Sequence, residues 1–128
     1  MSAVLPSQEA VQIFLANADK GPVVMLNLLK FKAHGGEATY GKYAQAVGKI
    51  VEAHGGKVLY AGRAAELMVG TEEWDAVVLV QYPSRQALID MFNSPEYQAI
   101  HHYREEGLER TVLYATDPLA ALSFGQER

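Results

Sequence analysis

Apolar residues recur at helical spacing near the start of the chain. Val11, Phe14, Leu15 and Ala18 are separated by three or four positions, which places them on one stripe of a helix. Because Pro6-Ser7 precedes the stripe and Gly21-Pro22 follows it, the pattern predicts an amphipathic helix that stops at Gly21-Pro22. We expect this helix to cover another part of the molecule.

The segment from Val23 to Phe31 is a nearly unbroken apolar run, interrupted only by Asn27 and Lys30. A short run of this kind is typical of a strand that is covered on both faces. Asn27 is the exception, because a buried amide must hydrogen-bond to backbone, water or a ligand. The sequence is consistent both with a satisfied core amide and with a ligand contact at this position.

A second helical stripe follows the glycines at positions 35 and 36, and Gly55-Gly56 closes it at the C-cap. Two strands are then predicted over residues 57–64 and 74–82, joined by a polar connection, and we expect them to pair as a hairpin. The residues of the helical stripe are Tyr40, Tyr43, Ala44, Val47, Ile50, Val51 and His54.

The next helix is predicted to begin at Pro83-Ser84 and to restart at Ser94-Pro95. Ser94 is a favourable N-cap. Pro95 is favourable at the first helical position, because an N–H there would have no acceptor within the helix. Gly107 ends this helix, and residues 111–116 form the last predicted strand. The remainder to residue 128 is a tail in which Leu119, Leu122 and Phe124 are possible docking points.

This order predicts an α+β domain with ferredoxin-like βαββαβ topology, a four-stranded antiparallel sheet and an extra N-terminal helix. We expect a single domain over residues 1–128, divided into an N-terminal helix (1–21), a core (22–116) and a tail (117–128). Right-handed crossovers place both core helices on the same face of the sheet.

The other face of the predicted sheet is also apolar, because both sets of alternating residues in the first and third strands are apolar. A bare face of this kind exposes more apolar surface than a monomer usually does. We therefore expect a second copy to cover it in a two-fold homodimer, sheet against sheet. In the alternative, the N-terminal helix or the tail covers that face within one chain.

Composition narrows the range of partners. The net charge of the 128 residues is -4, and Lys and Arg do not form a stripe, so nothing favours binding to nucleic acid. The chain has no cysteine, which excludes disulfides and thiolate chemistry and is typical of a reducing compartment. Neither a leader nor an apolar run of about 18 residues is present, so we expect a cytoplasmic protein that does not contact membranes.

Three segments resemble the domain-of-unknown-function family 1330, which lies in the dimeric α+β barrel superfamily. They are residues 58–63, residues 74–84 and the box from Asn93 to Gln98, and the likeness runs from about Val23 to Ala115. The resemblance implies a ferredoxin-like protomer and a dimeric barrel, but this family has no assigned reaction. Superfamily relatives that are enzymes, such as cofactor-independent monooxygenases, use a pocket between the sheet and the helices.

Polar residues in otherwise apolar elements are the candidates for lining such a pocket. We assign His101 and Arg63 as candidate catalytic residues, for proton transfer and for binding a carboxylate. The candidate substrate-binding residues are Asn27, Tyr60, Tyr82 and Trp74. Ordinary structural roles explain them too: Arg63 could pair with Glu66 or Asp75 across the hairpin, and the aromatic residues could be packing or interface anchors.

Two pairs, His101–Glu105 and His102–Glu106, have the four-residue spacing that can place two ligands on one metal. No third ligand is evident, and such pairs are common on solvated helices, so we predict no metal. We also predict no cofactor, because the glycine pairs lack the spacing of a phosphate-binding or dinucleotide-binding loop.

Two hypotheses for function remain. The first is a small enzyme that binds a compact organic molecule, such as a carbonyl compound or lactone. It predicts an enclosed pocket of a few hundred Å³ lined by at least two of Asn27, Arg63, Tyr82 and His101. The second is a non-catalytic dimeric binding or structural module, in which those side chains pair with each other and leave no cavity.

Overall fold

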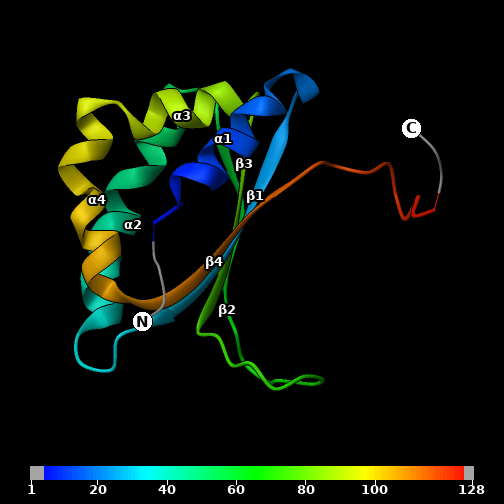
Figure 1. The fold of residues 1–128 in the computed structure, drawn as a ribbon. Helices are drawn as coiled ribbons and strands as arrows, with labels where there is room; N and C mark the ends of the chain where they lie inside the picture. The colour runs from blue at the N-terminus through cyan, green and yellow to red at the C-terminus, as the bar shows by residue number, and fades with distance from the viewer. Residues whose placement is uncertain (1–4, 126–128) are drawn as a thin grey trace.

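The computed structural model describes residues 5–125, and the predicted N-terminal and tail segments extend beyond this range at residues 1–4 and 126–128. One helix and a short 3-10 turn precede a core in which strands and helices alternate (Figure 1). The elements are α1 (Gln8–Ala16), η1 (Ala18–Lys20), β1 (Val23–Phe31), α2 (Gly36–Ala53), β2 (Lys57–Arg63), β3 (Ala76–Tyr82), α3 (Arg85–Phe92), α4 (Pro95–Gly107) and β4 (Leu108–Thr116).

The four strands form one antiparallel sheet in the order β2-β3-β1-β4. This order confirms the predicted ferredoxin-like arrangement, because each of the two outer strands is joined to an inner strand through a helical crossover. β1 lies in the centre, where Leu26 pairs with Leu79 of β3 on one side and with Tyr114 of β4 on the other.

Helices α1, α2, α3 and α4 all lie on one side of the sheet (Figure 1). The N-terminal helix packs beside α3, so within the described chain it does not cover the other face. On that open side, the β2–β3 connection and the segment after β4 both project away from the sheet (Figure 1). Within residues 5–125, neither the N-terminal helix nor the segment after β4 covers that face.

Serine residues cap the N-termini of α1, α3 and α4. The sequence predicts helix starts at Ser84 and Ser94, and it places Ser7 just before the apolar stripe of α1. The hydroxyls of Ser7, Ser84 and Ser94 accept hydrogen bonds from the backbone N–H groups of Ala10, Ala87 and Tyr97 at 3.0, 3.1 and 3.3 Å. Each of these bonds satisfies one N–H that the first helical turn leaves without a partner.

The predicted start of the last strand was wrong by three residues, because β4 begins at Leu108 and not at Thr111. Leu108 pairs with Phe31 and Arg110 pairs with Lys30, and the register shifts between these two pairs. The start of this strand is not evident in the sequence, because Glu109 and Arg110 are polar and a bulged edge strand lacks a regular alternation of apolar and polar residues. The strand therefore follows directly from the end of α4.

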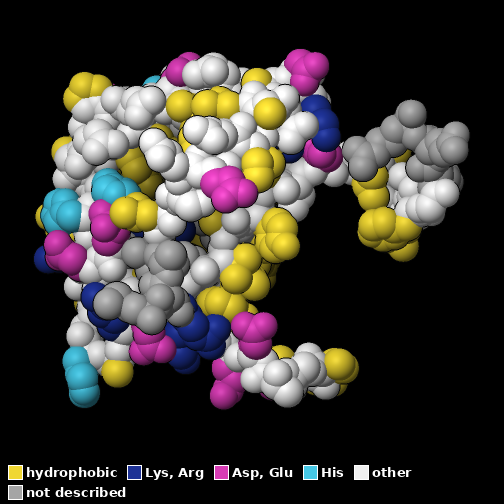
Figure 2. Space-filling view, viewed as in Figure 1, with side chains coloured by type: hydrophobic (Ala, Val, Ile, Leu, Met, Phe, Trp, Pro, Cys, Tyr) yellow, Lys and Arg dark blue, Asp and Glu magenta, His cyan; other side chains and the backbone are white. Residues whose placement is uncertain are grey.

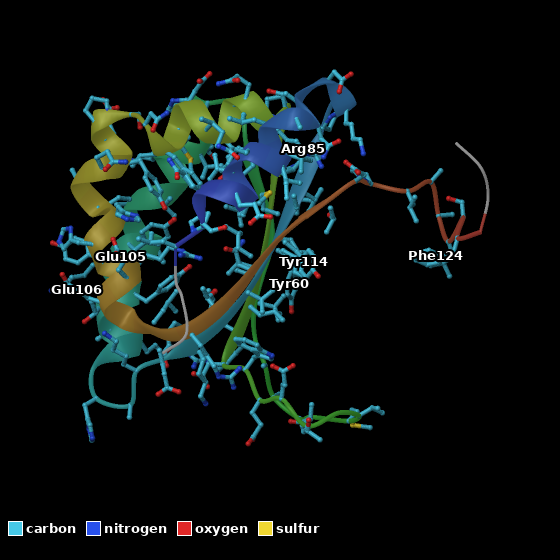
Figure 3. All side chains as sticks on the ribbon, viewed as in Figure 1. Tyr60, Arg85, Glu105, Glu106, Tyr114 and Phe124 are labelled. Carbon is cyan, nitrogen blue, oxygen red and sulfur yellow. The ribbon has the colours of Figure 1, made fainter. Side chains whose placement is uncertain are left out.

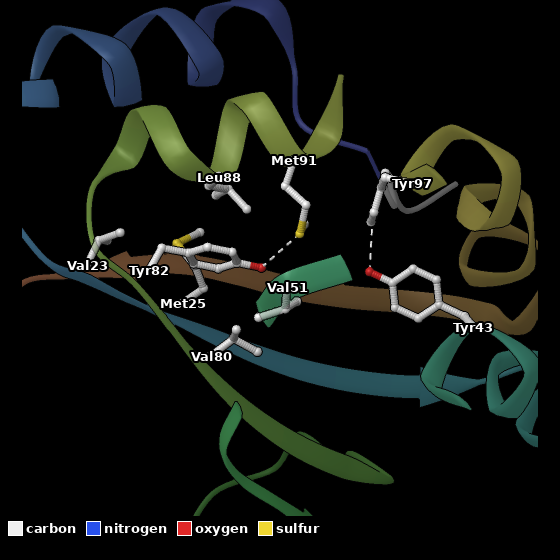
Figure 4. Close-up of a cluster of buried hydrophobic side chains, with 9 residues drawn as sticks. All are labelled: Val23, Met25, Tyr43, Val51, Val80, Tyr82, Leu88, Met91 and Tyr97. Atoms are coloured by element: carbon white, nitrogen blue, oxygen red, sulfur yellow. Dashed lines mark hydrogen bonds between the residues drawn. The ribbon is translucent and has the colours of Figure 1, made fainter. Parts of the chain in front are cut away.

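The core lies between the sheet and the helices. Figure 4 shows nine buried side chains there, which come from β1, α2, β3, α3 and α4. They are Val23, Met25, Tyr43, Val51, Val80, Tyr82, Leu88, Met91 and Tyr97. Three are tyrosines, and hydroxyl groups therefore occur in the middle of an otherwise apolar layer.

The opposite face of the sheet carries a row of apolar side chains that the described chain leaves uncovered. Tyr60, Leu79, Leu26 and Tyr114 are successive partners across β2, β3, β1 and β4. Tyr60 and Tyr114 are 56% and 64% exposed and lie on the two edge strands, and Figure 3 shows both turned away from the helices. Apolar surface is visible along this side of the body in Figure 2.

Among the described residues, none of the helices is both long enough and apolar enough to cross a lipid bilayer.

Candidate functional site

The core contains a cavity of about 300 Å³ between the sheet and the helices. Well-packed protein interiors contain few voids larger than a water molecule, so a space of this size is a candidate ligand site. Most of the buried core cluster lines the cavity, including Met25, Val80, Leu88 and Met91. The walls are therefore mainly apolar, and the polar groups described below are the exceptions.

Helix α4 supplies the imidazole, the guanidinium and one of the phenol groups of this cavity. Tyr97, His101 and Arg104 all line it, and their spacing of four and three residues places them on one face of the helix. The Ser94 cap and Pro95 fix the start of α4, so the local sequence that begins the helix also sets the direction in which this face points.

His101 is held by a carboxylate on its own helix. Its Nε2 lies 2.5 Å from Oε1 of Glu105, whereas its Nδ1 is buried and has no hydrogen-bonding partner among the described residues. When Nε2 carries the ring hydrogen and donates a hydrogen bond to Glu105, Nδ1 has a free lone pair. In this tautomer, Nδ1 can accept a hydrogen bond.

Two tyrosine hydroxyls meet in the cavity wall. The hydroxyls of Tyr43 and Tyr97 are 3.0 Å apart, and the two rings meet edge to face (Figure 4). Because one hydroxyl donates to the other, one hydrogen of the pair is left to donate to a ligand. Burial is the largest influence on both residues and raises the pKa of each above its usual value of 10.0.

Arg104 is the positive charge of the cavity. It is only 6% exposed, and its charge acts to lower the pKa values of Tyr40, Tyr43, Tyr82 and Tyr97 against the larger effect of burial. The Arg104 guanidinium therefore acts electrostatically on four tyrosines that line the cavity. The sequence analysis missed Arg104, although its spacing from Tyr97 and His101 is a signal that could have identified it.

Asn27 and Tyr82, two of the predicted substrate-binding residues, also line the cavity. The amide nitrogen of Asn27 donates to the backbone oxygen of Val78 at 3.3 Å, so its orientation is set by the neighbouring strand. The Tyr82 hydroxyl donates to the sulfur of Met91 at 3.7 Å, and burial raises its pKa well above 10.0 (Figure 4). Both residues add polar atoms to the apolar walls.

Arg63 lies elsewhere. Its guanidinium forms two hydrogen bonds with the carboxylate of Glu37, at the start of α2, and both side chains are mainly exposed. The expected partners were Glu66 and Asp75, but Asp75 instead bonds to Lys30 and to the backbone N–H of Phe31. The sequence places Arg63 at the end of a strand, where helix α2, distant along the chain, can reach it.

Tyr60 and Trp74 are also outside the cavity. Tyr60 lies on the open face of the sheet, and its ring covers Gly62, where an added Cβ would meet the Tyr60 hydroxyl. Trp74 lies just before β3 and stacks against the guanidinium of Arg110 at 4.2 Å. Of the six predicted site residues, the structure therefore brings Asn27, Tyr82 and His101 together and leaves Arg63, Tyr60 and Trp74 apart.

In residues 5–125, no three His, Cys, Asp or Glu side chains are grouped so that they could hold a metal ion. The polar groups of the cavity are instead imidazole, guanidinium, amide and phenol. These groups suit the binding of a neutral or anionic organic molecule by hydrogen bonds.

Residues 30–117 match the family described as "Domain of unknown function (DUF1330)". The chain belongs to this family. The matched segment includes α2, α4 and the whole of β2, β3 and β4, and therefore most of the cavity wall. The search of curated proteins found no match.

Solved structures similar to this DUF1330 protein include a protein of unknown function from Rhodopseudomonas palustris. It has 29% sequence identity and a TM-score of 0.86, over 94% of this chain and 99% of that one. A methylated form of the same protein has 30% identity and a TM-score of 0.86, over 94% and 97% of the two chains.

More distant structures share only the fold. A "dabb family protein with a ferredoxin-like fold" from Mesorhizobium loti has 14% identity and a TM-score of 0.59, over 78% of this chain and 99% of that one. A putative antibiotic biosynthesis monooxygenase from Bacteroides thetaiotaomicron has 16% identity and a TM-score of 0.61, over 79% and 92%. These likenesses support the ferredoxin-like α+β fold of the DUF1330 chain and carry no activity to it.

Proposed function

We propose that this protein is a homodimer that binds and converts a compact organic carbonyl compound in the cavity between its sheet and helices. The observation that carries the proposal is the convergence of His101, Arg104 and the Tyr43–Tyr97 pair on an apolar cavity of about 300 Å³. A purely structural module would fill this space with side chains. The cavity therefore favours the first of the two hypotheses drawn from the sequence.

The chemistry that these groups suit is proton transfer at a carbon next to a carbonyl. Nδ1 of His101 takes the proton from that carbon, and the electron pair of the C–H bond forms a carbon–carbon double bond. The electrons of the C=O bond move onto oxygen, where the Arg104 guanidinium and a tyrosine hydroxyl stabilise the negative charge. The His101 imidazolium then returns the proton, so that no cofactor is needed.

Asn27 and Tyr82 are proposed to contact the substrate from the sheet, opposite α4. Arg63, Tyr60 and Trp74 have no role in this proposal, because each lies outside the cavity and contacts other residues. The charge that the sequence analysis assigned to Arg63 is supplied here by Arg104.

The dimer is the second part of the proposal. The row Tyr60–Leu79–Leu26–Tyr114 leaves apolar side chains on a sheet face that no described helix covers, and a second copy would bury them. A solved structure of similar fold from Bacteroides fragilis, with 13% identity and a TM-score of 0.53 over 75% of this chain and 95% of that one, is described as dimeric. That description is consistent with sheet-to-sheet association.

The test follows deuterium exchange into cyclopentanone and γ-butyrolactone in D₂O by NMR, with cyclopentanol as the matched ligand that lacks a carbonyl group. The protein should accelerate exchange next to the carbonyl, and His101→Asn should remove the acceleration, by on the order of a hundredfold. His102→Asn is the matched control, because His102 is the neighbouring imidazole and is exposed.

Two results would contradict this proposal. If His101→Asn exchanges as fast as the wild-type protein, the imidazole is not the base. If the carbonyl compounds and cyclopentanol bind equally weakly and no exchange is accelerated, the non-catalytic module is the better description.

A further inference from the structure

A second cavity, which we call the α1 groove, lies between α1, α3 and β4 and has a volume of about 380 Å³. It adjoins the cavity with His101 but is not lined by His101 or Arg104. Six residues line both spaces: Pro6, Val11, Met25, Leu88, Phe92 and Leu113. The walls of the α1 groove include Ile13 and Phe14 of α1, Ile89 of α3, and Leu113 and Ala115 of β4.

Helix α1 packs loosely on the rest of the molecule, and its Phe14 contacts the core cluster. None of its residues is buried, although the helix carries the apolar stripe that the sequence predicts. Ile13 lines the groove and is still 59% exposed. An amphipathic helix normally buries its apolar face against its neighbours, so the apolar face of α1 has room for another apolar group.

The groove contains one buried cation. Arg85 is 5% exposed and lines the groove. It is the first residue of α3 and lies near α1 (Figure 3). Its Nη2 donates to Oδ1 of Asp117 at 3.1 Å, and its guanidinium lies 5.4 Å from the centre of the Phe14 ring. Its Nη1 is buried and has no acceptor among the described residues. A buried donor without an acceptor is unusual, and either a water molecule or a ligand atom would satisfy it.

The charges around Arg85 favour an anion. The carboxylate of Asp117 is shared by Arg85 and by Lys20, whose Nζ is 4.0 Å from the other carboxylate oxygen. Two cations therefore face one carboxylate, which leaves one positive charge in excess at this end of the groove. The N-terminus of α3 adds a partial positive charge at the same place.

We propose that the α1 groove binds a small apolar carboxylate. One carboxylate oxygen accepts a hydrogen bond from Nη1 of Arg85, and the hydrocarbon chain lies against Phe14, Ile89 and Leu113. A volume of about 380 Å³ holds roughly a dozen groups the size of a water molecule, which suits a chain about as long as octanoate. This site is additional to the proposed carbonyl site and does not use His101.

The test measures binding of octanoate, octanol and octylamine to the full-length protein by calorimetry and by amide NMR shifts. Octanoate should bind one per chain and at least tenfold more tightly than octanol, because only the carboxylate makes a charge-assisted bond with Arg85. Octylamine should bind more weakly still. The shifts should concentrate on α1, α3 and β4.

Variants separate the site from the overall fold. Ile13→Glu adds a negative charge at the exposed rim of the groove and should weaken octanoate binding at least tenfold. Gln12→Glu is the matched control, because it adds the same charge at the adjacent exposed position, which does not line the groove. Arg85→Gln should remove the preference for octanoate over octanol, with circular dichroism as the check on folding.

Equal affinity for octanoate and octanol, or equal octanoate affinity in wild type and Ile13→Glu, would overturn the proposal. So would the absence of saturable binding at millimolar concentration, which is the result expected if a second copy of the chain fills the groove. His101→Asn should leave octanoate binding unchanged, so a failure of the carbonyl proposal and a failure of this one are distinguishable.

Discussion

The tyrosines that line the cavity between the sheet and the helices stay protonated in the folded chain at pH values where free tyrosine ionises. Burial is the largest influence on Tyr40, Tyr43, Tyr82 and Tyr97, and it raises the pKa of each above 10.0. Below pH 10 these groups are neutral in both the folded and the unfolded state. Between pH 10 and their raised pKa values they release protons mainly on unfolding, so the free energy of unfolding falls as pH rises.

We predict that Tyr82→Phe makes this alkaline loss of stability less steep. One tyrosine contributes up to about 1.4 kcal/mol per pH unit to the slope, and a phenylalanine contributes none. Urea unfolding of both proteins at one protein concentration, between pH 9 and pH 11, measures the two slopes. Equal slopes would show that the Tyr82 hydroxyl is not buried as described.

Glu105 is a positioning residue for the proposed base. Replacing it by glutamine removes the carboxylate that accepts from Nε2 and orients the ring, so we predict that Glu105→Gln lowers the carbonyl exchange rate on the order of tenfold or more. Glu106→Gln is the matched control one residue further along, on the outer surface (Figure 3). A loss of the same size in both variants would point to a general effect on α4.

At the scale of elements, α4 carries the site and is fixed at both ends. Ser94 caps its start, and at its end Gly107 lies against Gly36 of α2, where a Cβ on Gly107 would be 2.8 Å from the Gly36 oxygen. The close approach of two backbones requires glycine at both positions. Tyr97, His101 and Arg104 lie between these two anchors, which keep the cavity face of the helix turned inward.

Loss of the Ser94 cap should therefore affect both stability and function. Ser94→Ala removes the acceptor for the Tyr97 N–H and is predicted to cost about 1 kcal/mol in the free energy of unfolding, with weaker ligand binding. Ser7→Ala removes a similar cap from α1, a helix without buried residues, and should cost less because α1 can fray locally. Chemical denaturation of the two variants makes the comparison, and an equal cost would contradict this ranking.

The sequence predicted elements better than it predicted contacts. Caps and glycines are local signals, so the helix starts at Ser84 and Ser94 and the end at Gly107 were visible in the pattern. The partner of Arg63 was not, because Glu37 is 26 positions away and only the packing of α2 against β2 brings the two together. The role of Arg104 was missed for a related reason: a charged residue on a helix looks solvated until the fold shows which face is covered.

At the scale of the whole molecule, the open sheet face is the surface that the described part of one chain leaves uncovered. Tyr60, Leu26, Leu79 and Tyr114 form an apolar row there, and the β2–β3 connection and the tail extend from the same side with exposed apolar residues of their own. Within the described residues, this face is therefore apolar and uncovered. The sequence reached the expectation of a partner through simple alternation, because a strand with two apolar faces needs two covers.

Leu79→Glu should separate the proposed dimer. A charge in the middle of the apolar row would be buried without a partner between two sheets, whereas it remains solvated in a single chain. Light scattering should find twice the chain mass of 14.0 kDa for the wild type and a single chain mass for the variant. Gln12→Glu, on the outer side of α1, is the control for added charge, and a wild-type protein that is monomeric at micromolar concentration would rule out the association.

The most direct test of the proposed function is a crystal structure of the protein soaked with cyclopentanone. The ketone should lie in the cavity between sheet and helices, with its oxygen within hydrogen-bonding distance of Arg104 or the Tyr43–Tyr97 pair and a neighbouring carbon facing Nδ1 of His101. A structure in which side chains close this cavity and the ketone is absent from it would contradict the proposal.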